Sequence, residues 1–166
     1  ELDDNGGSDS DLILTVQSGA VGPGGATQPP AIGFFQQTIA TGLSLSTFNH
    51  YAITLKNAVG GGVTQNFYVN GQRTGTSTLG ADNVSEIKGL VKGRIGALQT
   101  APSSSLGTGT EVSGDGKLSG SLDEFRFWKT QRTGRQIGLN YFKNIGGGSS
   151  TDDATKDLGL CFKFNE

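Results

Sequence analysis

Apolar and polar residues alternate along several short segments of the chain, a period of two that is typical of β-strands with one buried face. The alternation is clearest in G-S-L-D-E-F-R-F-W (120–128), where Phe125 and Phe127 share one face. We expect this segment to be an inner strand of the fold, with both phenylalanines in the core. The neighbouring acids Asp123 and Glu124 are then expected to point to opposite faces of the sheet.

Similar alternation predicts further strands on both sides of this segment. They cover residues 11–17, 31–40, 49–56, 65–69, 92–98 and 158–164. Asn70-Gly71 follows one of them and predicts a tight hairpin, because both residue types tolerate the positive φ that such turns need. The long polar segment 100–117 is expected to be a mobile or functional loop.

One short helix is predicted near 133–143, directly after the strand with the two phenylalanines. Thr133 lies three residues before Gln136, which is the spacing of a capping box. Apolar residues at helical spacing then give the helix one side that can pack on a sheet. This stripe consists of Ile137, Tyr141, Phe142 and Ile145.

Composition supports an all-β chain with a single folded domain. The 166 residues include 28 glycines and 4 prolines and only 17% charged residues, as expected for short strands joined by many turns. Two antiparallel sheets packed face to face fit this pattern best. We expect residues 1–10 to be an acidic, Gly- and Asp-rich terminus or loop, and residues 11–166 to form the β-sandwich.

Charge and hydropathy exclude two classes of partner. The formal net charge of -2 and the scattered lysines and arginines argue against nucleic acid, and no apolar run is long enough for membrane insertion. The single cysteine, Cys161, has no partner for an internal disulfide, and we expect a structural thiol. Because the chain lacks methionine and begins without an apolar leader, we expect a processed product or part of a longer protein.

Three motifs in fixed order resemble one known family. They are F-N-H-Y-A-I-T-L (48–55), F-Y-V-N-G-Q (67–72) and G-S-L-D-E-F-R-F-W-K-T-Q-R-T-G-R-Q-I (120–137). Together they are similar to the laminin G-like and pentraxin-like domains of the concanavalin A-like lectin/glucanase superfamily. The resemblance implies an antiparallel two-sheet jelly-roll sandwich that is often extracellular and binds glycans, glycoproteins or matrix. It also implies that the sandwich of residues 11–166 is missing its first strand or strands.

Some members of that family bind calcium at the rim of the sandwich. In pentraxin-like members the acids and amides that do so follow the strand matching 91–96, but in this chain the segment is A-L-Q-T (97–100). Apolar side chains do not coordinate a hard cation, so we expect that site to be absent. Glu111 and Asp115 remain as candidate calcium ligands, and no other cofactor is expected.

The sequence favours a protein without catalytic activity. Glucanases of this superfamily use two carboxylates that point together into a cleft, whereas Asp123 and Glu124 are adjacent and are expected to diverge. His50 is the only histidine, which argues against zinc sites built on several histidines. No G-x-S-x-G motif accompanies it, and we expect a strand histidine held by hydrogen bonds.

Exposed aromatic and basic side chains are the candidate ligand contacts. Sugar rings stack on aromatic faces, and protein partners favour Tyr, Trp and Arg anchors. We assign this role to Tyr68, Arg73 and Trp128. The alternative for Tyr68 and Trp128 is that each lies beneath the helix or a loop.

Two hypotheses of function follow. The first is a recognition or adhesion module that binds glycans or cell-surface ligands within a larger protein. The second is a structural or decoration domain of a larger assembly, such as a phage virion or fibre, with neighbouring subunits as partners. Both place the protein outside cells, on a cell surface or on a virion, and a glycoside hydrolase is the least favoured third hypothesis.

Overall fold

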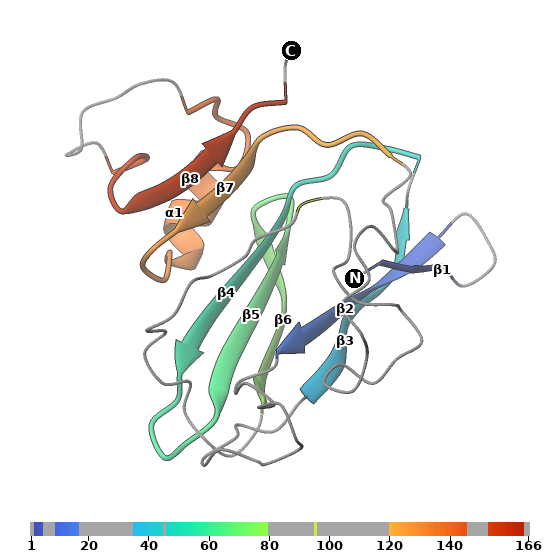
Figure 1. The fold of residues 1–166 in the computed structure, drawn as a ribbon, viewed down its shortest axis with the longest axis vertical. Helices are drawn as coiled ribbons and strands as arrows, with labels where there is room; N and C mark the ends of the chain where they lie inside the picture. Colours follow the sequence, from blue (N-terminus) through green and yellow to red (C-terminus); the bar gives the residue numbers. More distant parts are fainter. Residues whose placement is uncertain are drawn as a thin grey trace, which may run out of the picture.

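The computed structural model describes residues 2–4, 9–16, 35–44, 46–79, 95, 120–145 and 153–164. Within these ranges the chain forms eight strands and one helix (Figure 1). In chain order they are β1 (Leu2–Asp4), β2 (Asp9–Val16), β3 (Phe35–Ser44), β4 (Tyr51–Asn57), β5 (Val63–Val69), β6 (Gln72–Leu79), β7 (Phe125–Trp128), α1 (Gly134–Asn140) and β8 (Leu158–Phe162).

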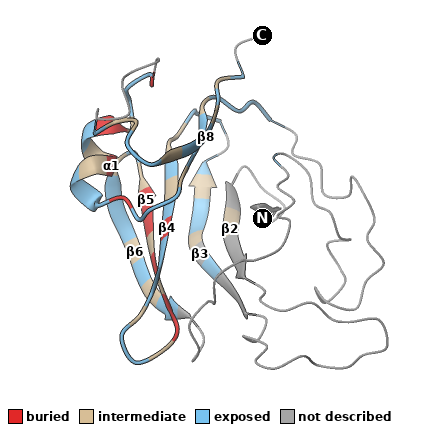
Figure 2. Ribbon diagram, turned by 60° about the vertical axis from the view of Figure 1, so that its left-hand side comes forward, coloured by how far each residue is buried: buried red, intermediate tan, exposed pale blue. Residues whose placement is uncertain are grey.

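All strand pairs in the described ranges are antiparallel. They form sheets with the orders β1-β2-β3, β4-β5-β6 and β7-β8. The β4-β5-β6 sheet lies in the middle, with β1-β2-β3 on one side and β7, β8 and α1 on the other (Figures 1 and 2). The predicted antiparallel β fold with one short helix is therefore confirmed, while the two-sheet jelly-roll arrangement stays a prediction.

The best buried part of the described structure is β5, the central strand of its sheet (Figure 2). Phe67 is fully buried, and its ring stacks on that of Tyr51 with 6.2 Å between the ring centroids. Buried Gln65 accepts a hydrogen bond of 2.7 Å from the Ser77 hydroxyl. Because a buried amide is stable only when it is bonded, this contact allows a polar residue inside the sheet.

The predicted hairpin and helix cap are both confirmed. Asn70 and Gly71 have φ of 49° and 79°, the two positive values of a type I′ turn between β5 and β6. Thr133 and Gln136 form the reciprocal bonds of a capping box at the start of α1. The helix ends at Asn140, earlier than expected, and Phe142 is 69% exposed, so its predicted place in the buried stripe is wrong.

The strand with the two phenylalanines differs from expectation in length and in orientation. Residues 120–124 are not extended strand, and β7 begins only at Phe125, directly after Glu124 with φ of 49°. The face with Arg126 and Trp128 turns toward α1, because Arg126 bonds to Asn140. Phe127 on the opposite face is 53% exposed, so the predicted core position of the phenylalanines is wrong.

The β7-β8 pair therefore carries an apolar face away from α1. Its register places Phe125 opposite Phe162 and Phe127 opposite Leu160, and Phe164 stacks on Phe162. We call this surface the β7-β8 apolar face. Its members, each between 37% and 53% exposed, are Phe125, Phe127, Leu160, Phe162 and Phe164. Cys161 alternates with them and is half-buried, in line with the predicted structural thiol.

At the amino end, strands extend into the acidic stretch expected to be a loop or terminus. β1 lies within residues 1–10, and β2 begins at Asp9 and pairs with β1. Part of this stretch is therefore sheet, and the division of the chain into residues 1–10 and 11–166 stays a prediction. The predicted strand at 92–98, apart from Ile95, and the loop at 100–117 with Glu111 and Asp115 lie outside the described residues. No helix in the described ranges is long and apolar enough to cross a membrane.

Candidate functional site

A cavity of about 520 Å³ lies where the β4-β5-β6 sheet meets α1 and the β7-β8 pair. One wall comes from the residues before β4 and from the β5-β6 turn. The other comes from the start of β7, the residues after α1 and the residue after β8. Its lining consists of Phe48, Asn49, His50, Asn70, Asp123, Glu124, Arg126, Tyr141, Phe142, Lys143, Asn144 and Lys163.

Asn70 holds the first wall together. Its side-chain oxygen accepts from the His50 backbone N–H at 2.9 Å, and its own backbone N–H donates to the His50 carbonyl at 2.8 Å. Its side-chain amide also donates to the side-chain oxygen of Asn49 at 2.9 Å. The residue whose positive φ makes the hairpin turn therefore also fixes the two residues that precede β4.

Arg126 holds the second wall together. Its side chain is only 7% exposed, and its guanidinium donates to the Asn140 carbonyl at 3.0 Å and to the Lys143 carbonyl. Glu124 pairs with the same guanidinium. The last carbonyls of a helix lack partners within the helix and carry partial negative charge, so a buried cation at this position both satisfies and stabilises them.

Two neighbouring carboxylates, those of Asp123 and Glu124, belong to the same cavity. Glu124 has an unusual backbone conformation. Its φ of 49° interrupts the extended backbone just before β7. Asp123 and Glu124 both line the cavity, so the expectation that they point to opposite faces is wrong. A non-glycine residue in this conformation costs on the order of 1 kcal/mol, and the ion pair with Arg126 provides a compensating interaction.

Three buried polar atoms in this lining have no hydrogen-bond partner. They are Nδ1 of His50, Oε1 of Glu124 and Nε of Arg126. An unsatisfied buried donor or acceptor costs about 1–3 kcal/mol, which makes such groups uncommon in folded proteins. Protein atoms cover all three, so they belong to residues of the lining without facing the open cavity, and a fourth such atom, Nε1 of Trp128, lies outside the lining.

His50 is uncharged at neutral pH. Burial, and second the nearby positive charge of Arg126, lower the pKa of its imidazole from the ordinary value of 6.5. Its ring lies tilted against Tyr141 with 5.8 Å between centroids. The predicted histidine is therefore held by its backbone bonds to Asn70 and by ring packing. A neutral imidazole offers one donor and one acceptor.

Two aromatic rings stand open at the cavity. Phe48 is 75% exposed and Phe142 is 69% exposed, and both belong to the lining. Phe142 meets the Tyr141 ring edge-on at 5.2 Å, a preferred arrangement that orients it. The cavity thus combines exposed aromatic rings with amides, carboxylates and cations.

The predicted ligand contacts lie elsewhere. Tyr68 is 4% exposed, and its ring lies beneath the start of α1, where a Cβ at Gly134 would be 3.4 Å from it. Trp128 has the Arg132 guanidinium 5.4 Å from its ring centroid, and Arg73 is exposed on β6. None of the three predicted residues lines the cavity, and their role in binding stays a prediction.

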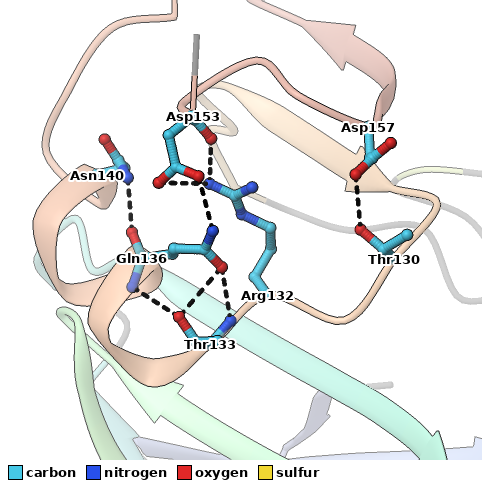
Figure 3. A network of polar contacts seen from close by, with 7 residues as sticks. All are labelled: Thr130, Arg132, Thr133, Gln136, Asn140, Asp153 and Asp157. Atoms are coloured by element: carbon cyan, nitrogen blue, oxygen red, sulfur yellow. Dashed lines mark hydrogen bonds and ion pairs between the residues drawn. The ribbon is translucent and has the colours of Figure 1, made fainter. Parts of the chain in front are cut away.

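A second polar network braces the amino end of α1 (Figure 3). Arg132 donates to the Asp153 carbonyl, and the Gln136 side chain donates to the Asp153 carboxylate at 2.9 Å. Thr130 donates to Asp157 at 3.3 Å. These bonds tie the turn before β8 to the helix. A smaller cavity of about 300 Å³ adjoins this turn, but none of the three unpartnered atoms belongs to its lining.

The described ranges show no cluster of side chains for metal binding. They contain no group of three or more His, Cys, Asp or Glu side chains that could hold an ion.

No single sequence signal marks most of this site. Asn70 is recognisable in the sequence only as a turn residue, His50 only as a strand residue and Phe142 only as part of a helix stripe. Their convergence depends on how the hairpin turn meets the end of α1.

Comparison with known proteins places the chain in a family. The family model described as the Concanavalin A-like lectin/glucanases superfamily matches residues 8–138, which is most of the chain. The chain belongs to this superfamily. The resemblance seen in the sequence motifs is thereby confirmed, as is the laminin G-like character of the fold. The superfamily's name covers both lectins and glucanases, so membership alone does not choose between binding and hydrolysis. No curated protein and no solved structure matched the chain.

Proposed function

We propose that this protein is a non-catalytic recognition module that binds glycans in the cavity between Phe48 and Phe142, on a two-sheet jelly-roll of the concanavalin A-like type. The observation that carries the proposal is a cavity of about 520 Å³ whose lining combines the exposed rings of Phe48 and Phe142 with amide and charged side chains. The volume lies in the range of about 300–1,000 Å³ that is usual for small-molecule sites.

Saccharide chemistry fits the groups present. Each sugar hydroxyl both donates and accepts hydrogen bonds, so neighbouring hydroxyls can serve an acceptor, such as the exposed carboxylate of Asp123, and a donor at once. The amides of Asn49 and Asn144 add groups of both kinds at the same lining. The apolar face of a sugar ring can cover an open phenyl ring such as Phe142, as expected for a site of aromatic rings and a few placed polar groups.

Binding without catalysis is supported by the state of the two carboxylates. Glycoside hydrolysis needs carboxyl groups on either side of the scissile bond, about 5 Å apart in retaining enzymes and farther apart in inverting ones. Asp123 and Glu124 are consecutive residues at one end of β7, and Glu124 is held in an ion pair with Arg126. This pairing favours a positioning role for Glu124.

A second candidate function has its own observation. The β7-β8 apolar face exposes four phenylalanines and a leucine. Contiguous apolar surface of this kind is typical of contacts between proteins. It favours a structural or decoration domain that packs this face on a neighbouring subunit of a larger assembly, such as a virion or fibre. Either function suits an extracellular, cell-surface or virion location.

A glycan array with and without calcium tests the first proposal. We expect binding of a defined set of saccharides by the unaltered protein. Phe142→Ala should weaken that binding about tenfold, equivalent to about 1.4 kcal/mol. Phe127→Ala is the matched control, since it removes an exposed phenyl ring outside the cavity. The proposal fails if no saccharide binds, or if both variants lose binding equally; stable association through the β7-β8 apolar face without saccharide binding would favour the second candidate.

A further inference from the structure

The charges around the cavity do not cancel. Glu124 and Arg126 neutralise each other as an ion pair. The remaining charged lining residues are Asp123, Lys143 and Lys163, two positive against one negative. The whole chain has a formal net charge of -2, so this local balance is opposite in sign to that of the protein.

Neither lysine is used in an ion pair with another described residue. The ion pairs among the described side chains are Arg126 with Glu124 and Arg132 with Asp153. Lys143 follows α1 and is exposed, and Lys163 follows β8 and is half-buried. Among the described residues, none competes with a molecule in the cavity for either ammonium group.

The two lysines reach the cavity from different segments. Arg126 bonds to the Lys143 carbonyl and so fixes that residue's backbone at the cavity. Lys163 directly follows Phe162, which pairs with Phe125, so Lys163 lies near the start of β7 where Glu124 stands. The Glu124–Arg126 pair thus adjoins the backbone of both segments that carry the lysines.

We propose that the ligand is an anionic saccharide, whose carboxylate or sulfate group binds Lys143 and Lys163. This inference rests on the proposed function and adds the charge class of the ligand. A hydrogen bond to a charged group is stronger than one between neutral groups. Asp123 repels the anionic group and favours placement of neutral hydroxyls on its side.

Matched pairs of oligosaccharides test this proposal by titration calorimetry. Each pair contains a uronic acid oligomer and the neutral oligomer of the same ring stereochemistry and length, for example trigalacturonic acid and galactotriose. The third ligand is the neutral oligomer after sulfation. Comparing its affinity with that of the uronic acid oligomer shows whether the site prefers sulfate or carboxylate. We expect at least one acidic member to bind about tenfold tighter than its neutral counterpart, and this preference to shrink as salt is raised.

Lysine variants locate the effect. Lys143→Gln and Lys163→Gln should each weaken acidic ligands about tenfold while leaving neutral ones unchanged. Lys129→Gln is the control, because Lys129 is exposed and outside the cavity. Unchanged thermal unfolding shows that each variant is folded.

The outcomes that contradict the proposal are distinct. If neutral oligomers bind as well as acidic ones and the lysine variants change nothing, the charge assignment is overturned while glycan binding stands. An equal loss in Lys129→Gln also overturns it, because the effect is then general charge attraction. If no saccharide of any arm binds, the proposed function itself is overturned.

Discussion

The ring of Tyr141 lies directly against Gly71: a Cβ atom on this glycine would be 2.5 Å from Cδ1 of the tyrosine. The contact joins the β5-β6 turn to the residue that follows α1. It therefore sets the distance between the two walls of the cavity. Any side chain at position 71 has to push the hairpin and the helix apart.

Gly71→Ala should therefore lower the free energy of unfolding by about 3 kcal/mol, because it combines positive-φ strain with steric overlap. Gly60→Ala is the control, since Gly60 has φ of 94° but open space around its Cβ position. It should lose only about 1 kcal/mol. Urea unfolding followed by the fluorescence of the single tryptophan measures both. Equal losses would show that the tyrosine contact contributes nothing.

Thr133→Ala should destabilise the protein by about 1 kcal/mol, because it removes the hydroxyl that accepts from the Gln136 N–H at 3.2 Å. Arg135→Ala changes an exposed residue of the same helix and should stay within about 0.5 kcal/mol of the unaltered protein. Circular dichroism during urea unfolding gives both values. The capping role is rejected if the two variants are equally stable.

Stability should fall as the pH is lowered below 6.5, because of His50. The pKa of its imidazole is lowered in the folded protein, so the unfolded chain binds the proton first. The loss begins near the ordinary pKa of 6.5 and ends at the lower pKa of the folded state. Above this window the imidazole is neutral in both states and has no pH effect.

The test is to measure the free energy of unfolding of the unaltered protein and of His50→Gln between about pH 7.5 and pH 5. This range spans the ordinary histidine pKa of about 6.5. The difference between the two curves isolates His50 from the carboxylates, which both proteins share. We expect His50→Gln to lose less stability over this range. Parallel curves would show that the imidazole keeps its ordinary pKa.

Arg126→Met should lower the free energy of unfolding by about 3–5 kcal/mol, because it leaves Glu124 as an uncompensated charge and frees the carbonyls at the end of α1. Arg73→Met is the matched control on the exposed surface of β6. It should change stability by less than about 0.5 kcal/mol. Denaturant unfolding of both variants measures the two losses of free energy. If Arg126→Met loses no more stability than Arg73→Met, Arg126 does not hold the second wall of the cavity together.

We expect no hydrolysis of β-glucans. Asp123 and Glu124 stand together at one end of β7 instead of on both sides of a bound sugar, and Glu124 pairs with Arg126. Release of reducing ends over a day is the measurement. Turnover that disappears in Glu124→Gln but persists in Asp157→Asn, which lies outside the cavity, would establish an enzyme instead.

Features encoded by neighbouring residues could be predicted from the sequence. The capping box depends only on Thr133 and Gln136, and the hairpin turn only on Asn70 and Gly71, so both were recognisable. The three ordered motifs also indicated the superfamily. Each of these depends on interactions within a few residues or on a pattern along the chain.

Orientation was harder to predict, because alternation separates two faces without saying which one is covered. In β7 the covered face is that of Arg126, since α1 supplies carbonyls for its guanidinium. Phe127 is left on the open face. The rule of alternating faces also failed for Asp123 and Glu124, because the positive φ of Glu124 lies outside any strand.

The cavity itself depends on contacts between distant segments. Its walls come from residues near 50, 70, 125, 142 and 163, and no short motif contains them. Tyr68 was a reasonable candidate by alternation, but the start of α1 covers it. Only the docking of the hairpin turn against Tyr141 brings the aromatic, amide and charged groups together.

Because the cavity is shared between the central sheet and the carboxyl-terminal segments, its occupant would act as a non-covalent cross-link. A saccharide held by both walls raises the melting temperature in proportion to the logarithm of its concentration, as for any ligand of the folded state alone. Mechanical tension that pulls the two walls apart would then have to expel the sugar first. For an adhesive protein, attachment and resistance to force would reside in the same contacts.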